Sequence, residues 1–89
     1  MENRIALIGI IVEDSEAVTT VNDLLHEYRE WIVGRMGLPY RQREVSIISV
    51  VLDAPEATIS SLSGKLGMCS GVSVKSVMAK NQRSKKDQE

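Results

Sequence analysis

The feature that most constrains the fold is an uninterrupted apolar run near the start of the chain. From Ile5 to Val12 every residue is aliphatic or glycine, and the run stops at the charged pair Glu13-Asp14. A short continuous run that is rich in β-branched residues predicts a strand buried in a sheet. Because a membrane-spanning helix needs about 20 apolar residues, this run predicts no membrane segment.

The rest of the chain alternates helical and extended patterns. Apolar residues at three- and four-residue spacing predict a helix over residues 15–28, and Pro55 fits the first position of a second helix whose buried stripe holds Ile59, Leu62 and Leu66. Residues 31–36, 45–52 and 72–78 read as further strands, with a hairpin turn over residues 37–43. The order βαββαβ predicts an α+β, ferredoxin-like fold, a four-stranded antiparallel sheet with two helices on one face.

Length and composition limit the organisation and the partners. A chain of 89 residues is long enough for one domain, which we place at residues 1–79, and the polar residues 80–89 are expected to form a disordered tail. The net charge of −1 provides no field for a polyanion, so direct nucleic-acid binding is not expected. With a single cysteine and no visible secretion signal, we expect a soluble, cytoplasmic protein.

Several sequence blocks resemble a known family. They are residues 8–14 (IGIIVED), residues 32–40 (IVGRMGLPY), residues 46–49 (SIIS), and residues 64–67 (GKLG) with residues 71–75 (GVSVK). Across residues 3–79 the chain resembles the small ACT-like proteins known as iron-only hydrogenase system regulators, which are related to the ligand-sensing domain of nickel-responsive repressors. The resemblance implies an ACT-like fold and a regulatory function.

One group of residues is a candidate binding site for a small ligand. Arg35, Arg41 and Arg43 gather around the predicted hairpin with Tyr40, and guanidinium groups bind phosphates or carboxylates through paired hydrogen bonds. Ser15, at the start of the first helix, adds a hydroxyl donor. The alternative is that the arginines are solvated charges that pair with nearby glutamates.

No residue set predicts catalysis or a cofactor. One histidine, His26, and one cysteine, Cys69, are too few for a zinc or nickel site within one chain, and neither has a partner that would make a nucleophile–base pair. We therefore expect no enzyme, no metal and no cofactor. Two alternatives stay open: a metal or redox sensor in which His26 and Cys69 converge across subunits, and a nucleic-acid-binding transcriptional regulator.

Both sides of the two central strands are apolar, which predicts self-association. Two helices cover only one side of a sheet, and a half-solvated sheet normally alternates apolar with polar residues. We therefore expect a homodimer, or a tetramer of stacked dimers, that works as a non-enzymatic module for ligand sensing or partner docking. The predicted interface residues are Ile8, Ile10, Val12, Ile48 and Val50.

Overall fold

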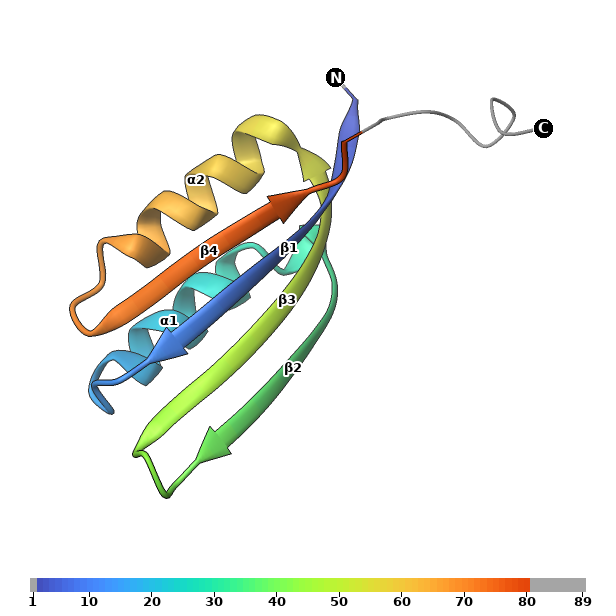
Figure 1. Cartoon of the computed structure of the whole chain (residues 1–89). Helices are drawn as coiled ribbons and strands as arrows, with labels where there is room; N and C mark the ends of the chain where they lie inside the picture. The colour runs from blue at the N-terminus through green and yellow to red at the C-terminus, as the bar shows by residue number, and fades with distance from the viewer. Residues whose placement is uncertain (1, 81–89) are drawn as a thin grey trace.

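The computed structural model describes residues 2–80, and its elements follow the order β-α-β-β-α-β (Figure 1). This order confirms the α+β ferredoxin-like class predicted from the sequence. A short 3₁₀ helix, η1, leads into the second strand. The bounds are β1 (Asn3–Val12), α1 (Ala17–Glu27), η1 (Arg29–Trp31), β2 (Ile32–Tyr40), β3 (Val45–Pro55), α2 (Glu56–Gly67) and β4 (Val72–Met78).

The sheet has the strand order β2-β3-β1-β4, and every neighbouring pair is antiparallel. β1 and β3 are the central strands, and β2 and β4 lie at the edges. Their pairing runs from Asn3 opposite Pro55 to Val12 opposite Ser46. Because directly opposed residues point to the same side of a sheet, this register decides which side chains share each face.

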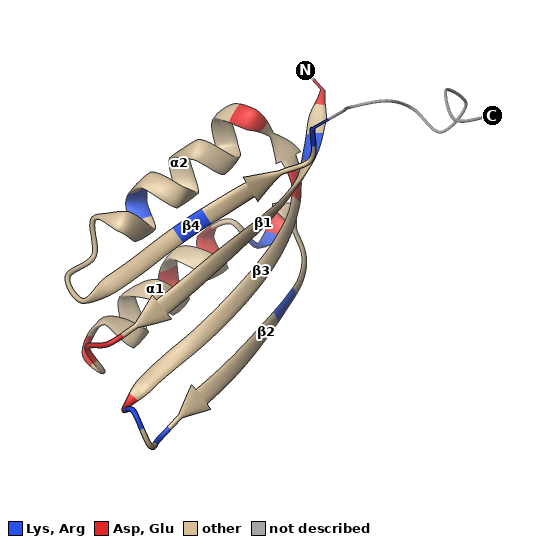
Figure 2. Cartoon of the chain, viewed as in Figure 1, with Lys and Arg blue, Asp and Glu red and all other residues tan. Residues whose placement is uncertain are grey.

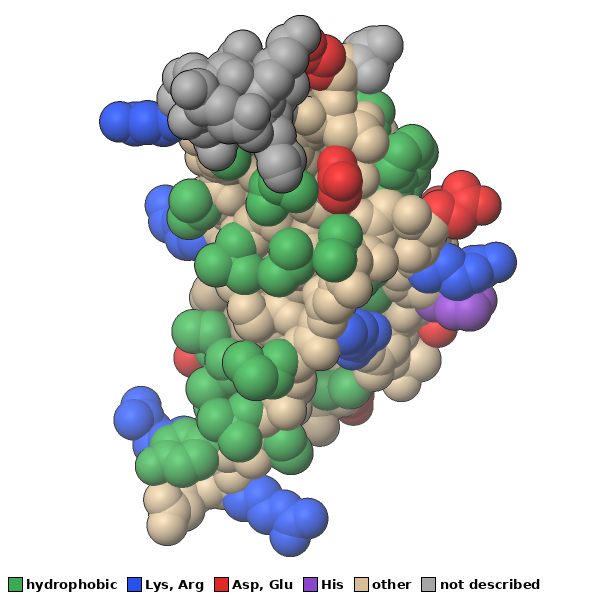
Figure 3. Space-filling model, turned by 90° about the vertical axis from the view of Figure 1, so that its right-hand side faces the viewer, with side chains coloured by type: hydrophobic (Ala, Val, Ile, Leu, Met, Phe, Trp, Pro, Cys, Tyr) green, Lys and Arg blue, Asp and Glu red, His purple; other side chains and the backbone are tan. Residues whose placement is uncertain are grey.

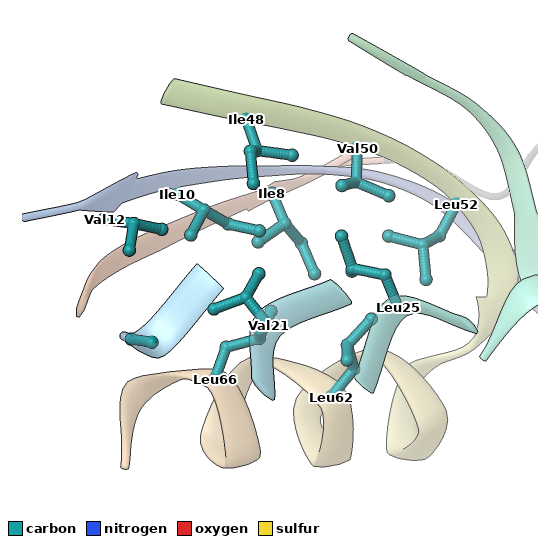
Figure 4. Close-up of a cluster of buried hydrophobic side chains, with 11 residues drawn as sticks. Ile8, Ile10, Val12, Val21, Leu25, Ile48, Val50, Leu52, Leu62 and Leu66 are labelled. Atoms are coloured by element: carbon teal, nitrogen blue, oxygen red, sulfur yellow. The ribbon is translucent and has the colours of Figure 1, made fainter. Parts of the chain in front are cut away.

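The core lies between one face of the sheet and the two helices, which both cover that face (Figure 1). Side chains of β1 and β3 point toward α1 and α2, where they meet the buried stripes of both helices (Figure 4). Each large aliphatic side chain buried in this way contributes about 1.5–3 kcal/mol. The labelled members are Ile8, Ile10, Val12, Val21, Leu25, Ile48, Val50, Leu52, Leu62 and Leu66.

The residues predicted to form the subunit interface belong to this core instead. Ile8, Ile10, Val12, Ile48 and Val50 are between 0% and 5% exposed and lie under the helices of their own chain. Their assignment to an exposed face was therefore wrong. In β1 both sides are apolar, so the apolar content of that strand did not distinguish the covered side from the open side.

Some element boundaries also differ from the predicted ones. β2 continues to Tyr40, so the hairpin turn is confined to residues 41–44 and Glu44 adopts a positive φ of 57°. Gly37 and Pro39 are tolerated because β2 is an edge strand with one side of its backbone unpaired. Pro55 precedes α2 as its N-cap residue rather than forming its first turn.

The loops at the far end of the sheet from the chain termini are joined by the backbone. The amide of Glu13 donates to the carbonyl of Gly71 at 2.7 Å, which ties the turn after β1 to the turn before β4. The Asp14 carboxylate accepts a hydrogen bond from the amide of Glu16, the N-cap residue of α1, at 2.9 Å. This end of the molecule therefore has a defined backbone geometry.

The remaining sequence predictions concern the tail and the membrane. Of the predicted tail, residues 81–89 lie outside the described part of the chain. Within residues 2–80, neither helix combines the length and the hydropathy that a bilayer-spanning segment requires.

Candidate functional site

The predicted ligand-binding residues lie at or near the hairpin between β2 and β3. Tyr40 ends β2, and Arg41 and Arg43 belong to the four-residue turn that follows. The turn is closed by two backbone hydrogen bonds, from the Arg43 amide to the Tyr40 carbonyl (3.2 Å) and from the Glu44 amide to the Arg41 carbonyl (3.1 Å). The positive φ of Glu44 lets the chain reverse direction within so few residues.

Three of the five predicted residues line one cavity, which we call the hairpin cavity. Ser15, Tyr40 and Arg41 surround a volume of about 340 Å³ between the hairpin and the start of α1. Glu44 and Ser46 add a carboxylate and a second hydroxyl to its lining. The hairpin cavity thus combines a cation, an anion and hydroxyl groups, with apolar walls from Val12, Val18, Pro39 and Val45.

The other two predicted residues lie elsewhere. Arg35 donates a hydrogen bond to the Asn22 side-chain oxygen of α1 at 2.9 Å, so it holds β2 to the helix layer. Arg43 lines a second cavity of about 330 Å³ together with Glu13 and Ile11, and Tyr40 lines both cavities. The structure therefore divides the predicted arginine cluster into three different environments.

Sequence reasoning missed Ser46 as a member of the hairpin cavity. Ser46 pairs with Pro39 in the β2–β3 ladder, a register that exists only because β2 extends to Tyr40. With residues 37–43 taken as turn, this pairing was hidden. The sequence signal that could have identified Ser46 is its position between the apolar Val45 and Ile47, since a strand turns neighbouring side chains to opposite faces.

Charges of both signs gather at this end of the molecule. Figure 2 shows basic residues on the hairpin and acidic residues where β3 begins and on the turn after β1, while the strands between them carry little charge. Arg41 shares its cavity with Glu44, and Arg43 shares its cavity with Glu13. The hairpin is therefore a mixed-charge region rather than a basic patch.

A second polar cluster connects the two helices. The Tyr28 hydroxyl and the Ser61 hydroxyl are hydrogen bonded at 2.9 Å, and the Lys65 ammonium lies 5.2 Å from the centre of the Tyr28 ring and 3.8 Å from the Glu27 carboxylate. The hydrogen bond with Ser61, followed by the interaction with Lys65, lowers the pKa of Tyr28 from its ordinary value. The same contact with Tyr28 raises the pKa of Lys65. This cluster fastens α1 to α2.

His26 and Cys69 lie at opposite ends of the helix layer. Cys69 lines a cavity beside Ala17, the first residue of α1, whereas His26 is near the last residue of that helix. Positions 17 and 26 are nine residues apart, which corresponds to about 14 Å along the axis of an α-helix. Among residues 2–80, no group of three or more His, Cys, Asp or Glu side chains is arranged to hold a metal ion.

The face of the sheet that the helices leave uncovered is unusually apolar; we call it the open face. Figure 3 shows hydrophobic side chains gathered there in two groups with less apolar surface between them. The pairing of the strands explains this pattern, because residues that lie directly opposite one another on the four strands form three parallel rows across the sheet. They are the Leu7 row (Val77, Leu7, Val51, Gly34), the Gly9 row (Lys75, Gly9, Ser49, Met36) and the Ile11 row (Ser73, Ile11, Ile47, Leu38).

The large apolar side chains of the open face are exposed to solvent. Leu38 is 56% exposed and Met36 is 70% exposed, and Ile5, Leu7, Ile11, Ile47 and Val77 are also exposed. Its charged groups, Lys75 and Asp53, lie on the edge strand β4 and near the end of β3. The centre of the open face is thus a nearly uncharged aliphatic surface.

Two solved structures with low sequence identity share the fold. The C-terminal domain of the MgtC protein from Mycobacterium tuberculosis is 13% identical with a TM-score of 0.69, and the alignment covers 93% of this chain and 95% of that one. A formyltetrahydrofolate deformylase from Pseudomonas putida KT2440 is 14% identical with a TM-score of 0.61, covering 82% of this chain and 28% of that one. No curated protein matches this sequence.

Two comparisons agree on the family. A family model described as "TM1266-like: Iron-only hydrogenase system regulator, putative" matches residues 4–76. The structure of TM1266 from Thermotoga maritima is 44% identical with a TM-score of 0.85, and the alignment covers 89% of this chain and 100% of that one. Both findings confirm the resemblance noted in the sequence. The chain belongs to the TM1266-like family of iron-only hydrogenase system regulators.

Proposed function

We propose that this chain is a non-enzymatic regulatory module of an iron-only hydrogenase system, and that its working form is a homodimer in which two open faces pack together. The regulatory role is supported by the family match. The observation that carries the mode of action is the exposed aliphatic surface of the open face. Such a surface acts by binding, because its aliphatic side chains can be buried against a partner but carry no group that could take part in a reaction.

The size of the open face is compatible with a reversible dimer. Three strand spacings of about 4.8 Å and a strand length of about 30 Å give a flat area of about 400 Å² before the relief of the side chains is added. Monomers seldom expose apolar patches of more than a few hundred Å². Stable interfaces begin at about 600 Å² on each partner, which is somewhat more than this flat area, so we expect the dimer to dissociate at low concentration.

A second copy of the chain suits this surface better than a charged partner. The charges of the open face are at its periphery, on Lys75 and Asp53, and its central rows are aliphatic. In a two-fold symmetric interface each copy presents the same patch, so two aliphatic surfaces are removed from water by one contact. Peripheral charges can then stay hydrated at the rim.

Light scattering on a dilution series of the purified protein tests the proposal. We expect a dimer mass at micromolar concentration and a monomer mass for the Leu38→Lys variant, because Leu38 is exposed on the open face and lysine there places a charge in the interface. Met68→Lys is the matched control, since Met68 is 86% exposed beyond the end of α2 and away from the open face. A monomeric wild-type protein, or a Leu38→Lys variant that is still dimeric, would contradict the proposal.

The hairpin cavity favours a second candidate function, which is the sensing of a small polar ligand by the same regulator. Its lining brings Arg41, Glu44, Ser15 and Tyr40 around one volume, a combination that suits a ligand bearing both charges. A thermal-shift screen of small carboxylates, phosphates and amino acids tests this function. A hit should raise the melting temperature of the wild-type protein but not of Arg41→Ala, and a shift that survives this substitution would place the ligand elsewhere.

A further inference from the structure

The middle of the open face contains a hollow above Gly9. Its volume is about 370 Å³, and it is bounded by Ile11 and Ile47 on one side and by Ser73 and Lys75 on the other. The hollow exists because Gly9 has no side chain and Ser73, the β4 neighbour of Ile11, has only a small one. It therefore interrupts the aliphatic surface at the centre of the Gly9 row.

The backbone at position 9 does not require glycine. A Cβ atom added to Gly9 would meet its nearest neighbour, the carbonyl oxygen of Lys75, at 3.9 Å, which is ordinary van der Waals contact. Glycine within a strand costs roughly 0.5–1 kcal/mol of stability relative to alanine. Glycine in a strand interior often marks a place where another group approaches closely.

A side chain that could occupy this hollow is present on the same row. Met36 lies on the edge strand β2, opposite Ser49, and is 70% exposed. Two strand spacings, about 10 Å, separate it from Gly9. Methionine is flexible and polarisable, so it fills irregular apolar gaps well.

Two-fold symmetry can bring these two features together. If the dimer axis runs parallel to β3 and passes over Ser49, rotation about it exchanges the positions of β1 and β2, which both flank β3. Met36 of each copy then lies over Gly9 of the other copy. The same rotation places Leu38 over Ile11 of the second copy and leaves Lys75 beyond the partner's sheet, where its ammonium group stays in water. It also brings the exposed Asp53 of the two copies opposite each other near the end of β3, so this end of the interface is its least favourable part.

We propose that, in the dimer, the Met36 side chain of each copy inserts into the Gly9 hollow of the other copy and so sets the register of the two sheets. This inference rests on the proposed packing of open faces. An axis between β1 and β3 would instead place Met36 over Lys75 and close each hollow with the hydroxyl of Ser49. Burial of that ammonium and that hydroxyl without partners is unfavourable, which favours the axis over Ser49.

Dissociation constants of four proteins test the inference: wild type, Gly9→Val, Met36→Ala and the double variant. Valine fills the hollow and is well suited to a strand, so Gly9→Val should remain folded while its dimer weakens by about tenfold or more. Met36→Ala should weaken the dimer to a similar extent, because the hollow is then left empty. In the double variant the new side chain occupies the space that Met36 vacates, so the dimer should be tighter than that of Gly9→Val alone. Met68→Ala, at an exposed methionine off this face, is the control and should leave the constant unchanged.

The outcomes separate this inference from the proposal on which it rests. A wild-type protein that is monomeric at all concentrations would overturn both. If Leu38→Lys dissociates the dimer while Gly9→Val and Met36→Ala leave its constant unchanged, the open face is the interface but Met36 does not use the hollow. Strictly additive effects in the double variant would also refute the contact, because residues that touch across an interface must be coupled.

Discussion

Gly71 is the position where a single methyl group should do the most damage to the fold. Its φ is +75°, a backbone conformation that side chains with a Cβ atom rarely adopt. An added Cβ would lie 2.6 Å from the Cβ atom of Asp14 and 3.3 Å from its amide nitrogen. The Gly71 carbonyl also accepts the hydrogen bond from Glu13 that joins the two turns. The substitution Gly71→Ala therefore strains the backbone and forces apart two loops that are held together.

The expected loss of stability has three contributions. The left-handed conformation costs alanine about 1–2 kcal/mol. Displacing Asp14 to relieve the overlap adds about 1–3 kcal/mol, a typical cost of overpacking. The lower conformational entropy of alanine in the unfolded chain offsets about 0.4–1 kcal/mol. We expect a net destabilisation of about 1–4.5 kcal/mol.

Urea unfolding followed by circular dichroism measures this loss, at one fixed protein concentration because a dimer gains stability with concentration. Gly64→Ala is the matched control: Gly64 lies in the middle of α2 with no atom within 4 Å of an added Cβ, so alanine should stabilise the protein by about 1 kcal/mol. A Gly71→Ala variant within about 0.5 kcal/mol of the wild type would refute the reasoning. It would mean that the two turns move apart at little cost.

Two further substitutions test the core and the hydrogen bond between Tyr28 and Ser61. Ile10→Lys should unfold the protein rather than merely dissociate it, because Ile10 is 1% exposed between the sheet and the helices; a folded monomer by circular dichroism would contradict this. Ser61→Ala should raise the pKa of Tyr28 toward its ordinary value, since the bond with Ser61 is the main cause of the lowered pKa, and phenolate absorbance against pH measures it. A pKa that is lowered by folding contributes stability only above the unfolded value of about 10, and this contribution disappears as the pH falls through the folded pKa. The effect of Ser61→Ala on stability should therefore be larger at alkaline than at neutral pH, and an equal effect at both would show that the pKa shift has another origin.

The candidate site was predictable from the sequence only in part. Hairpin residues with binding chemistry were recognisable by type, and Ser15, Tyr40 and Arg41 do line one cavity. Arg35 was grouped with them by sequence distance, but alternation along β2 points it to the helix side, where it bonds to Asn22. Sequence proximity along a strand does not bring side chains together, because successive residues point to opposite faces.

The succession of strands and helices was determined by local sequence patterns. The apolar run of β1 and the spaced stripe of α2 each specify an element without reference to the rest of the chain. Chain order then implied that β1 and β3 lie at the centre of the sheet, as they do. The extent of β2 was not local information, because only pairing with β3 holds Gly37 and Pro39 in a strand.

Which face of β1 is covered was decided only by the tertiary structure, through the pairing of β1 with β3. In β1, both alternating sets of residues are aliphatic apart from Gly9, so this strand alone gave no preference. In β3, one set holds only Ile48, Val50, Leu52 and Ala54 after Ser46, whereas the other includes Ser49 and Asp53. The helices cover the first set because burying Asp53 beneath them would remove a carboxylate from water without a partner. Pairing of β3 with β1 then fixes the covered side of β1 as well, since opposed residues in a ladder share a face.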